Sequence, residues 1–99
     1  MNVDPAAWPE AAVYFRFFPE GRRDQSVASA HIYRAEDARQ SNDNERLYIG
    51  RAGTDGVEFV YRRGSPGIWA YYPLKGDTDL KADDIDSFEQ AWRAGSIKV

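Results

Sequence analysis

The 99-residue sequence contains no cysteine. This absence excludes a disulfide framework, a thiolate nucleophile and a cysteine-based zinc site, and it fits a reducing compartment. The single histidine, His31, leaves only carboxylates as further metal ligands, and the carboxylates are not spaced as a calcium-binding loop. We therefore expect neither a metal nor another cofactor.

Positive charge and long hydrophobic runs are also scarce. Sixteen acidic residues against 13 basic ones give a formal net charge of −3, so the chain lacks the positive field that nonspecific phosphate binding needs. The longest apolar stretch is interrupted by Arg16 and falls far short of the ~20 residues of a membrane span. The first residues show no signal-peptide pattern. These features predict a cytoplasmic protein without a membrane partner.

Aromatic and hydrophobic residues are plentiful. They make up 14% and 42% of the sequence, a content typical of folded proteins and not of disordered chains. At this length we expect one domain, residues 1–99, with one hydrophobic core.

The sequence from Arg46 onward predicts an antiparallel meander. Residues 46–50, 57–62 and 68–72 have the alternation and aromatic content of strands. Glycine-rich turns at 53–56 and 64–67 separate them.

Residues 86–95 predict a helix with a signal at each end. Asp86 and Glu89 have the spacing of a capping box, and Gly95 is suited to stop the helix. The residues at i, i+3 and i+4 form one narrow apolar face, which would pack on the sheet: Phe88, Ala91 and Trp92.

The first third of the chain allows two interpretations. The β-branched and aromatic content of residues 12–18 favours a strand, which a turn at 19–21 could pair with residues 27–33. Alternatively, Pro9 begins a helix that ends before Gly21, with an apolar stripe of Ala11, Phe15 and Phe18. Further along we expect a strand at 29–33, a short helix or turn at 35–40 and a polar loop at 41–44.

No catalytic pattern emerges from the remaining motifs. His31 lies in an alternating segment without the nucleophile elbow of a hydrolase, so we interpret it as a packed or surface histidine of a strand. The glycine-rich residues 50–56 lack the Gly-Lys-Ser/Thr ending of a phosphate loop and precede a strand, which favours a turn. We therefore do not expect an enzyme.

The aromatic strand at 68–72 has two faces, and only one of them can belong to the core. Alternation places Trp69 and Tyr71 on one face, and Ile68, Ala70 and Tyr72 on the other. Whichever of the two faces is not in the core would be available to a partner, because Trp and Tyr dominate binding hot spots; alternation alone does not decide which face that is.

The segment after this strand is acidic. It carries six acids against Lys81, which indicates either a solvated loop with helix capping or a recognition patch for a basic partner. Together the rings and the acids give the candidate partner-binding residues Trp69, Tyr71, Tyr72, Asp77 and Asp79.

The order of these motifs resembles that of the SUKH superfamily, the Smi/Knr-like proteins. Trp8-Pro9 followed by Gly21, the segment 32–37, Ile49-Gly50 with Asp55-Gly56, and the helical segment 86–92 are similar to motifs of that family. The resemblance covers about residues 8–95. It implies a helix at 10–18 and an α+β fold, in which helices, including a C-terminal one, pack against a mostly antiparallel meander sheet.

The resemblance also implies binding and not catalysis. Many bacterial members of the superfamily are immunity proteins, which neutralise a toxin, often a nuclease, by binding it directly. An acidic chain would be attracted to a basic toxin. The alternative is a small nucleic-acid or ligand-binding sheet domain, since the aromatic strand at 58–61 is similar to base-stacking platforms. The acidic charge balance argues against that alternative.

Overall fold

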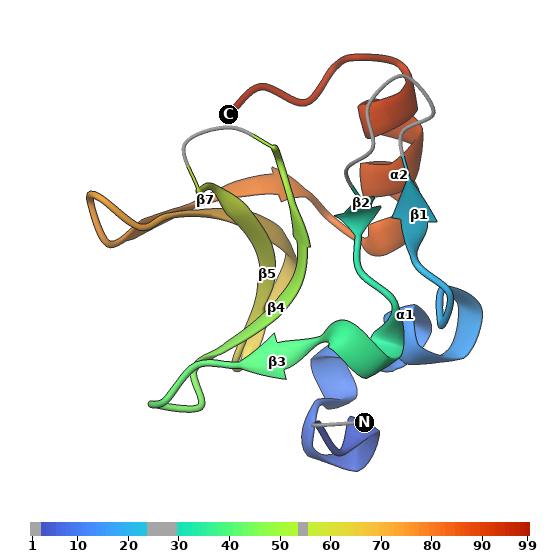
Figure 1. Ribbon diagram of the computed structural model, residues 1–99, viewed down its shortest axis with the longest axis vertical. Coiled ribbons are helices and arrows are strands. Elements are labelled where there is room, and N and C mark those ends of the chain that lie inside the picture. The colour runs from blue at the N-terminus through green and yellow to red at the C-terminus, as the bar shows by residue number, and fades with distance from the viewer. Residues whose placement is uncertain (1–2, 24–29, 54–55) are drawn as a thin grey trace.

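A computed structural model describes residues 3–23, 30–53 and 56–99 and confirms the α+β class (Figure 1). Within these ranges there is a five-stranded antiparallel sheet in the order β3-β4-β5-β6-β7, and a two-stranded sheet, β1-β2. The strands are β1 (Arg22–Arg23), β2 (Ala30–Ile32), β3 (Arg39–Gln40), β4 (Arg46–Arg51), β5 (Glu58–Arg62), β6 (Ser65–Tyr72) and β7 (Asp77–Ala82). The helices are η1 (Pro5–Ala7), η2 (Pro9–Ala11), α1 (Ala12–Phe17), η3 (Ala35–Asp37) and α2 (Ile85–Arg93).

The meander of β4, β5 and β6 is confirmed, but β6 begins three residues earlier than predicted. The chain turns at Arg63 and Gly64, and Gly67 lies inside the strand. Gly67 has a φ of 100°, and a Cβ there would lie 2.6 Å from Leu80 Cδ1 on β7. A glycine is therefore required where β6 passes close to β7. Of the turn predicted at 53–56, Thr54 and Asp55 lie outside the described residues.

Strand β7 was not predicted, because its sequence reads as a solvated acidic loop. It pairs with β6 through Ala70 opposite Asp79 and Tyr72 opposite Asp77. Aspartate is disfavoured in strands, yet β7 forms the edge of the sheet. Exposed charged side chains are common at such edges because they discourage further strand pairing.

Residues 12–17 form the helix α1, so the strand expected from propensity for residues 12–18 is wrong. Pro9 is the first residue of η2, which continues into α1. The core buries Ala11, Tyr14 and Phe18, whereas Phe15, which was expected in the apolar stripe, is only half-buried. Burial of one helical face outweighs the strand propensity of the individual residues.

The segment between the first helix and the main sheet contains short elements. Strand β2 confirms the expectation for 29–33 over Ala30–Ile32, and it pairs with β1, which follows Gly21. Residues 24–29 lie outside the described residues. Segment 35–40 divides into η3 and the two-residue strand β3, and residues 41–44 form the expected turn.

Helix α2 is confirmed, with a different residue at its start. Asp84, not Asp86, caps the helix by accepting a hydrogen bond from the Ser87 amide at 2.8 Å. Glu89 does not complete a capping box but is buried. The predicted end holds, since the Gly95 amide donates to the Trp92 carbonyl at 3.0 Å and the Ser96 amide to Ala91 at 2.8 Å.

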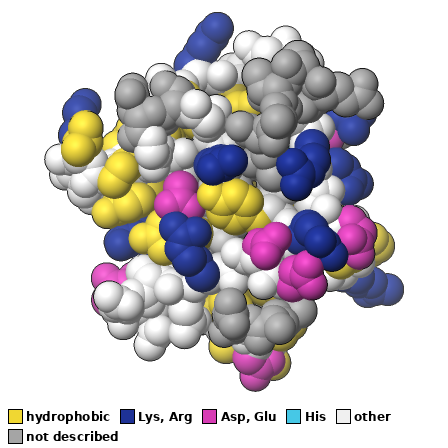
Figure 2. Space-filling model, in the orientation of Figure 1, with side chains coloured by type: hydrophobic (Ala, Val, Ile, Leu, Met, Phe, Trp, Pro, Cys, Tyr) yellow, Lys and Arg dark blue, Asp and Glu magenta, His cyan; other side chains and the backbone are white. Residues whose placement is uncertain are grey.

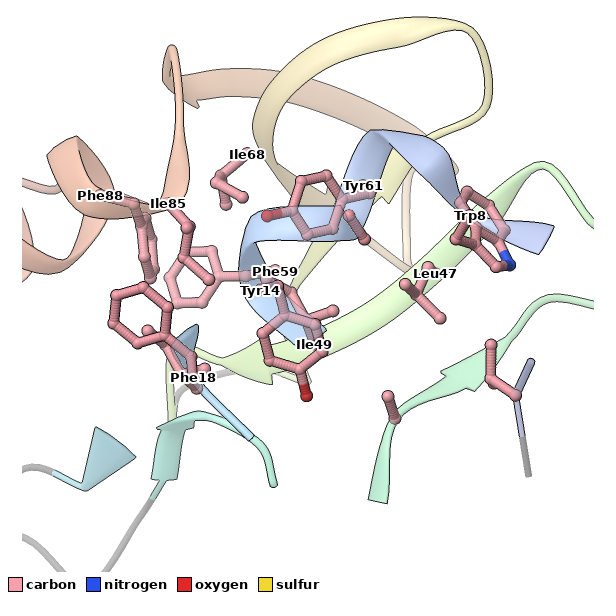
Figure 3. Packing of buried hydrophobic residues seen from close by; sticks show 14 of the residues in the cluster. Trp8, Tyr14, Phe18, Leu47, Ile49, Phe59, Tyr61, Ile68, Ile85 and Phe88 are labelled. Carbon is pink, nitrogen blue, oxygen red and sulfur yellow. The ribbon is translucent and has the colours of Figure 1, made fainter. Parts of the chain in front are cut away.

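The hydrophobic core lies between one face of the main sheet and the helices. Figure 1 shows α1, α2 and the β1-β2 pair on the same side of the sheet, which is bowed with its hollow side facing away from them. Residues from α1, α2 and the strands β2, β4, β5 and β6 meet in this core. Phe59 and Phe88, for example, have ring centroids 4.6 Å apart (Figure 3). The largest fully buried side chains are Trp8, Tyr14, Phe59, Phe88, Ile32, Leu47, Ile49, Ile68, Ile85 and Val60.

Candidate binding surface on the outer face of the sheet

Strand β6 directs its two alternating sets of side chains to opposite sides of the main sheet. Ile68 and Ala70 are fully buried in the core. Trp69 and Tyr71 therefore point to the opposite side, away from the helices, where they are half-buried. This outer face is the one that the sequence left undetermined, and two of the five predicted binding residues lie on it.

The rings on the outer face converge across the sheet. Tyr48 of β4 and Tyr71 of β6 have ring centroids 6.0 Å apart at an interplanar angle of 69°, although β5 lies between their strands. Val60 of β5 is 0% exposed beneath this group and is the cross-strand partner of both Tyr48 and Trp69. Such contacts fit the hollow curvature of this side of the sheet (Figure 1). We call Tyr48, Val60, Trp69 and Tyr71 the outer aromatic surface.

An arginine side chain lies over each ring of the outer aromatic surface. The guanidinium carbon of Arg39 is 4.5 Å from the ring centroid of Tyr48. The corresponding distance is 4.4 Å from Arg46 to Tyr71 and 4.7 Å from Arg62 to Trp69. Each such cation–π contact contributes about 0.5–1 kcal/mol at exposed sites. Figure 2 shows hydrophobic, basic and acidic side chains interleaved in the region over β4 and β5.

Glu58 is the acid that borders this surface on β5. Its carboxylate forms an ion pair with Arg39 at 2.7 Å and accepts a hydrogen bond from the Tyr33 hydroxyl at 3.1 Å. Burial, and then the Glu58 charge, raises the pKa of Tyr33 to about 12, so this hydroxyl stays a donor at neutral pH. Arg46 and Arg62 have no carboxylate within ion-pair distance in the described part of the chain. The surface is therefore locally basic in a chain of net charge −3.

The other predicted binding residues lie on the opposite side of the sheet. Asp77 and Asp79 are cross-strand partners of Tyr72 and Ala70, which face the core side. Tyr72 packs against the core, and Asp79 accepts a hydrogen bond from Lys81 at 2.9 Å. The acids and the two outer rings thus do not form one surface.

Sequence reasoning missed Tyr48 and the three arginines. A signal for them exists, because Arg46 and Tyr48 alternate with the buried Leu47 and Ile49. The contacts of Tyr48, Arg46 and Arg62 with β6, however, depend on strand register. That register shifts between Tyr48 and Gly50 and again between Val60 and Arg62, and such irregularities are not visible in the residue pattern.

His31 is packed in the interior, which is one of the two settings expected for it, a packed or a surface histidine. Its Nε2 lies 2.6 Å from a carboxylate oxygen of Glu89, and its ring stacks on Trp92 with centroids 5.2 Å apart at 9°. The Arg93 Nε donates to the other Glu89 oxygen at 2.6 Å. Among the described residues, Nδ1 of His31 has no hydrogen-bond partner. The pair joins β2 to α2.

In the described ranges, no three histidine or acidic side chains converge as a metal-binding group. No helix in those ranges is both long enough and apolar enough to cross a membrane.

Comparisons with protein-family models, curated proteins and solved structures find no match to this chain. The SUKH resemblance therefore stays a prediction.

Proposed function

We propose that this chain is a non-catalytic protein-binding module, and that it binds its partner through the outer aromatic surface and the arginines above it. The observation that carries the proposal is the gathering of Trp, Tyr and Arg side chains on one solvent-facing side of the sheet. These three residue types are the ones most enriched in the hot spots of protein interfaces.

The ordering of these side chains supports the proposal. Tyr48 and Tyr71 hold each other in an edge-to-face contact above the buried Val60. A guanidinium covers each outer ring. Side chains that are already held in place lose less conformational entropy when a partner binds, so more of the contact energy is available for affinity.

The biological role that we propose is of the immunity type, in which a bacterial protein neutralises a toxin by direct binding in the cytoplasm. This role depends on the resemblance to the SUKH superfamily. The lack of cysteine supports a reducing compartment. A basic nuclease as the toxin has the support of the net charge of −3. Next to the outer rings, however, the charge is positive, because three arginines lie over them and Glu58 pairs with only one of the three.

The test is affinity capture with matched variants. The wild-type chain, Trp69→Ala/Tyr71→Ala and the control Phe17→Ala serve as immobilised baits in a lysate of the native host. Phe17 is also an exposed ring beneath an arginine, but it lies on α1. We expect a protein that the wild type and Phe17→Ala retain and the double variant loses. A purified partner whose toxic activity the chain inhibits would support the immunity role.

Two results would contradict the proposal. One is a set of captured proteins that does not differ between the double variant and the wild type. The other is a partner that the Phe17→Ala control loses and the double variant keeps. Circular dichroism of each bait excludes unfolding as the cause.

The alternative function is binding of single-stranded nucleic acid, and one observation favours it. Rings and arginines share a sheet face, as they do on platforms where bases stack. Against it, guanidinium groups already cover the outer rings. A salt-sensitive shift of a labelled single-stranded oligonucleotide would support this alternative, and no shift at low salt would exclude it.

A further inference from the structure

Arg46 and Arg62 face each other directly on neighbouring strands. They are cross-strand partners between β4 and β5, and both project from the outer face. Like charges in such positions repel, and opposite charges are the favourable arrangement. The nearby Arg39 does have an acidic partner, since it forms an ion pair with Glu58 of β5 at 2.7 Å. Asp43 attracts Arg46 from a greater distance, but in the described part of the chain no carboxylate forms an ion pair with either arginine.

The two guanidinium groups are nevertheless held in place. Arg46 lies over Tyr71 and Arg62 over Trp69, at 4.4 and 4.7 Å. A guanidinium that stacks on a ring keeps its N–H donors at its own edge, where they can bind a carboxylate with two hydrogen bonds. In the described part of the chain, the Arg46 guanidinium makes only two long hydrogen bonds, from Nε and Nη2 to the Tyr48 hydroxyl oxygen, each 3.4 Å. The donors are oriented and largely unused.

The spacing of the two rings beneath the guanidinium groups indicates the form of the ligand. They lie over Trp69 and Tyr71, which are two residues apart on one strand. Acidic side chains at alternate positions of an extended segment are separated by the same repeat, about 7 Å. We infer that Arg46 and Arg62 bind two alternate carboxylates of an extended acidic segment in a protein partner. This inference rests on the proposed function and names the chemistry of the partner segment that contacts the outer face.

A protein carboxylate fits this surface better than nucleic-acid phosphate. The acidic chain has no broad positive field, and two uncompensated arginines release too few counterions for strong phosphate binding. Stacked bases would also have to displace the guanidinium groups from the rings.

The experiment titrates the intact chain with defined probes at low salt. The probes are a peptide of alternating glutamate and threonine, the corresponding lysine peptide, and an oligouridine of the same length. The NMR signal of the Trp69 indole N–H, which donates to the Pro66 carbonyl at 3.2 Å, reports on the surface. We expect the glutamate peptide to shift this signal and the other two probes to leave it unchanged.

Matched arginine variants separate recognition from general charge. Arg46→Gln/Arg62→Gln should bind the glutamate peptide at least about tenfold more weakly, a loss of about 1.4 kcal/mol. Arg16→Gln should bind like the wild type, because Arg16 lies over Phe17 on α1. Arg46→Lys/Arg62→Lys keeps the charge without the planar fork and should bind several-fold more weakly. An unchanged amide spectrum elsewhere confirms that each variant is folded.

Several outcomes would overturn the inference. They are equal binding by the glutamine double variant, equal loss in Arg16→Gln, tighter binding of oligouridine, and a Trp69 shift that grows with protein concentration alone, which would indicate a second copy as the occupant. A host protein retained by the glutamine double variant but lost by Trp69→Ala/Tyr71→Ala would overturn this inference and leave the proposed function intact.

Discussion

Glu89 is a carboxylate buried under α2, and three cations or potential cations surround it. His31 and Arg93 each approach it at 2.6 Å, and the Arg22 Nε lies at 3.9 Å. A buried charge is tolerated when hydrogen bonds replace its hydration. Through this carboxylate, Arg22 of β1 and His31 of β2 are both connected to the last helix.

The first prediction concerns this carboxylate. Glu89→Gln keeps the shape but weakens charge-assisted hydrogen bonds, and we expect a loss of about 2 kcal/mol in the free energy of unfolding, measured by urea denaturation. The control Glu36→Gln breaks an exposed pair with Arg34 at 2.8 Å and should cost less than about 0.5 kcal/mol. Equal effects of the two changes would contradict a structural role for the buried cluster.

The second prediction concerns alkaline pH. Burial, followed by the Glu58 charge, raises the pKa of Tyr33 from 10.0 to about 12. Between these two values the unfolded chain has lost this proton and the folded chain keeps it, so stability falls as the pH rises through this window. Denaturation at a series of pH values should show a smaller fall in Tyr33→Phe. A fall of the same size in Tyr33→Phe would contradict this role for Tyr33.

At the scale of elements, the close crossing of β2 and β4 depends on Gly50. The Tyr33 amide donates to the Ile49 carbonyl at 2.6 Å. A Cβ on Gly50 would overlap the carbonyl oxygen of His31. The two strands are therefore closer than any side chain at this position allows.

The third prediction follows from this crossing. Gly50→Ala should force the two backbones apart and lower the free energy of unfolding by about 2–3 kcal/mol, in the range of overpacked sites, measured by thermal and urea denaturation. The control Ala52→Ser adds one atom at a half-buried position nearby and should change stability by less than about 0.5 kcal/mol. A Gly50→Ala variant as stable as the wild type would refute the steric argument.

Elements with local signals could be predicted from the sequence. Gly95 marks the end of α2, and the alternation around Phe59 marks β5. The first helix could not be derived from propensity, because its evidence is tertiary: Tyr14 and Phe18 are buried against the sheet. Likewise β7 is a strand because β6 offers it hydrogen bonds, not because aspartate favours strands.

The candidate site could be predicted only in part, for a related reason. Alternation along β6 separated Trp69 and Tyr71 from the opposite face. The positions of Arg46 and Arg62 over those rings, however, follow from the register of three strands and the curvature of the sheet. Long-range pairing of this kind is set by the whole sheet and not by any one segment.

At the scale of the whole molecule, charge is distributed unevenly. Among the described residues, Arg46 and Arg62 on the outer face have no ion-pair partner, whereas the net charge of the chain is −3. The overall charge acts on distant partners, while the local charge determines which groups bind at the surface. Binding through the outer face should therefore weaken as salt is added.

The acids of β7 have a different role at this scale. Asp77 and Asp79 are exposed on the last strand of the sheet, whose outer edge has no neighbouring strand in the described part of the chain. An unpaired edge can add a strand from a second copy, and charges along it oppose this addition. Asp77 and Asp79 together carry more charge than Lys81, the one base on β7, so the edge is negatively charged.

The fourth prediction is that these acids keep the chain from self-associating. Asp77→Thr/Asp79→Thr replaces them with a residue that favours strands, and dimers or larger species should appear with increasing concentration in sedimentation velocity. The control Asp83→Thr/Asp86→Thr removes the same charge at exposed positions outside β7 and should stay at the wild-type size. If both variants associate equally, lower net charge and not edge protection would be the cause.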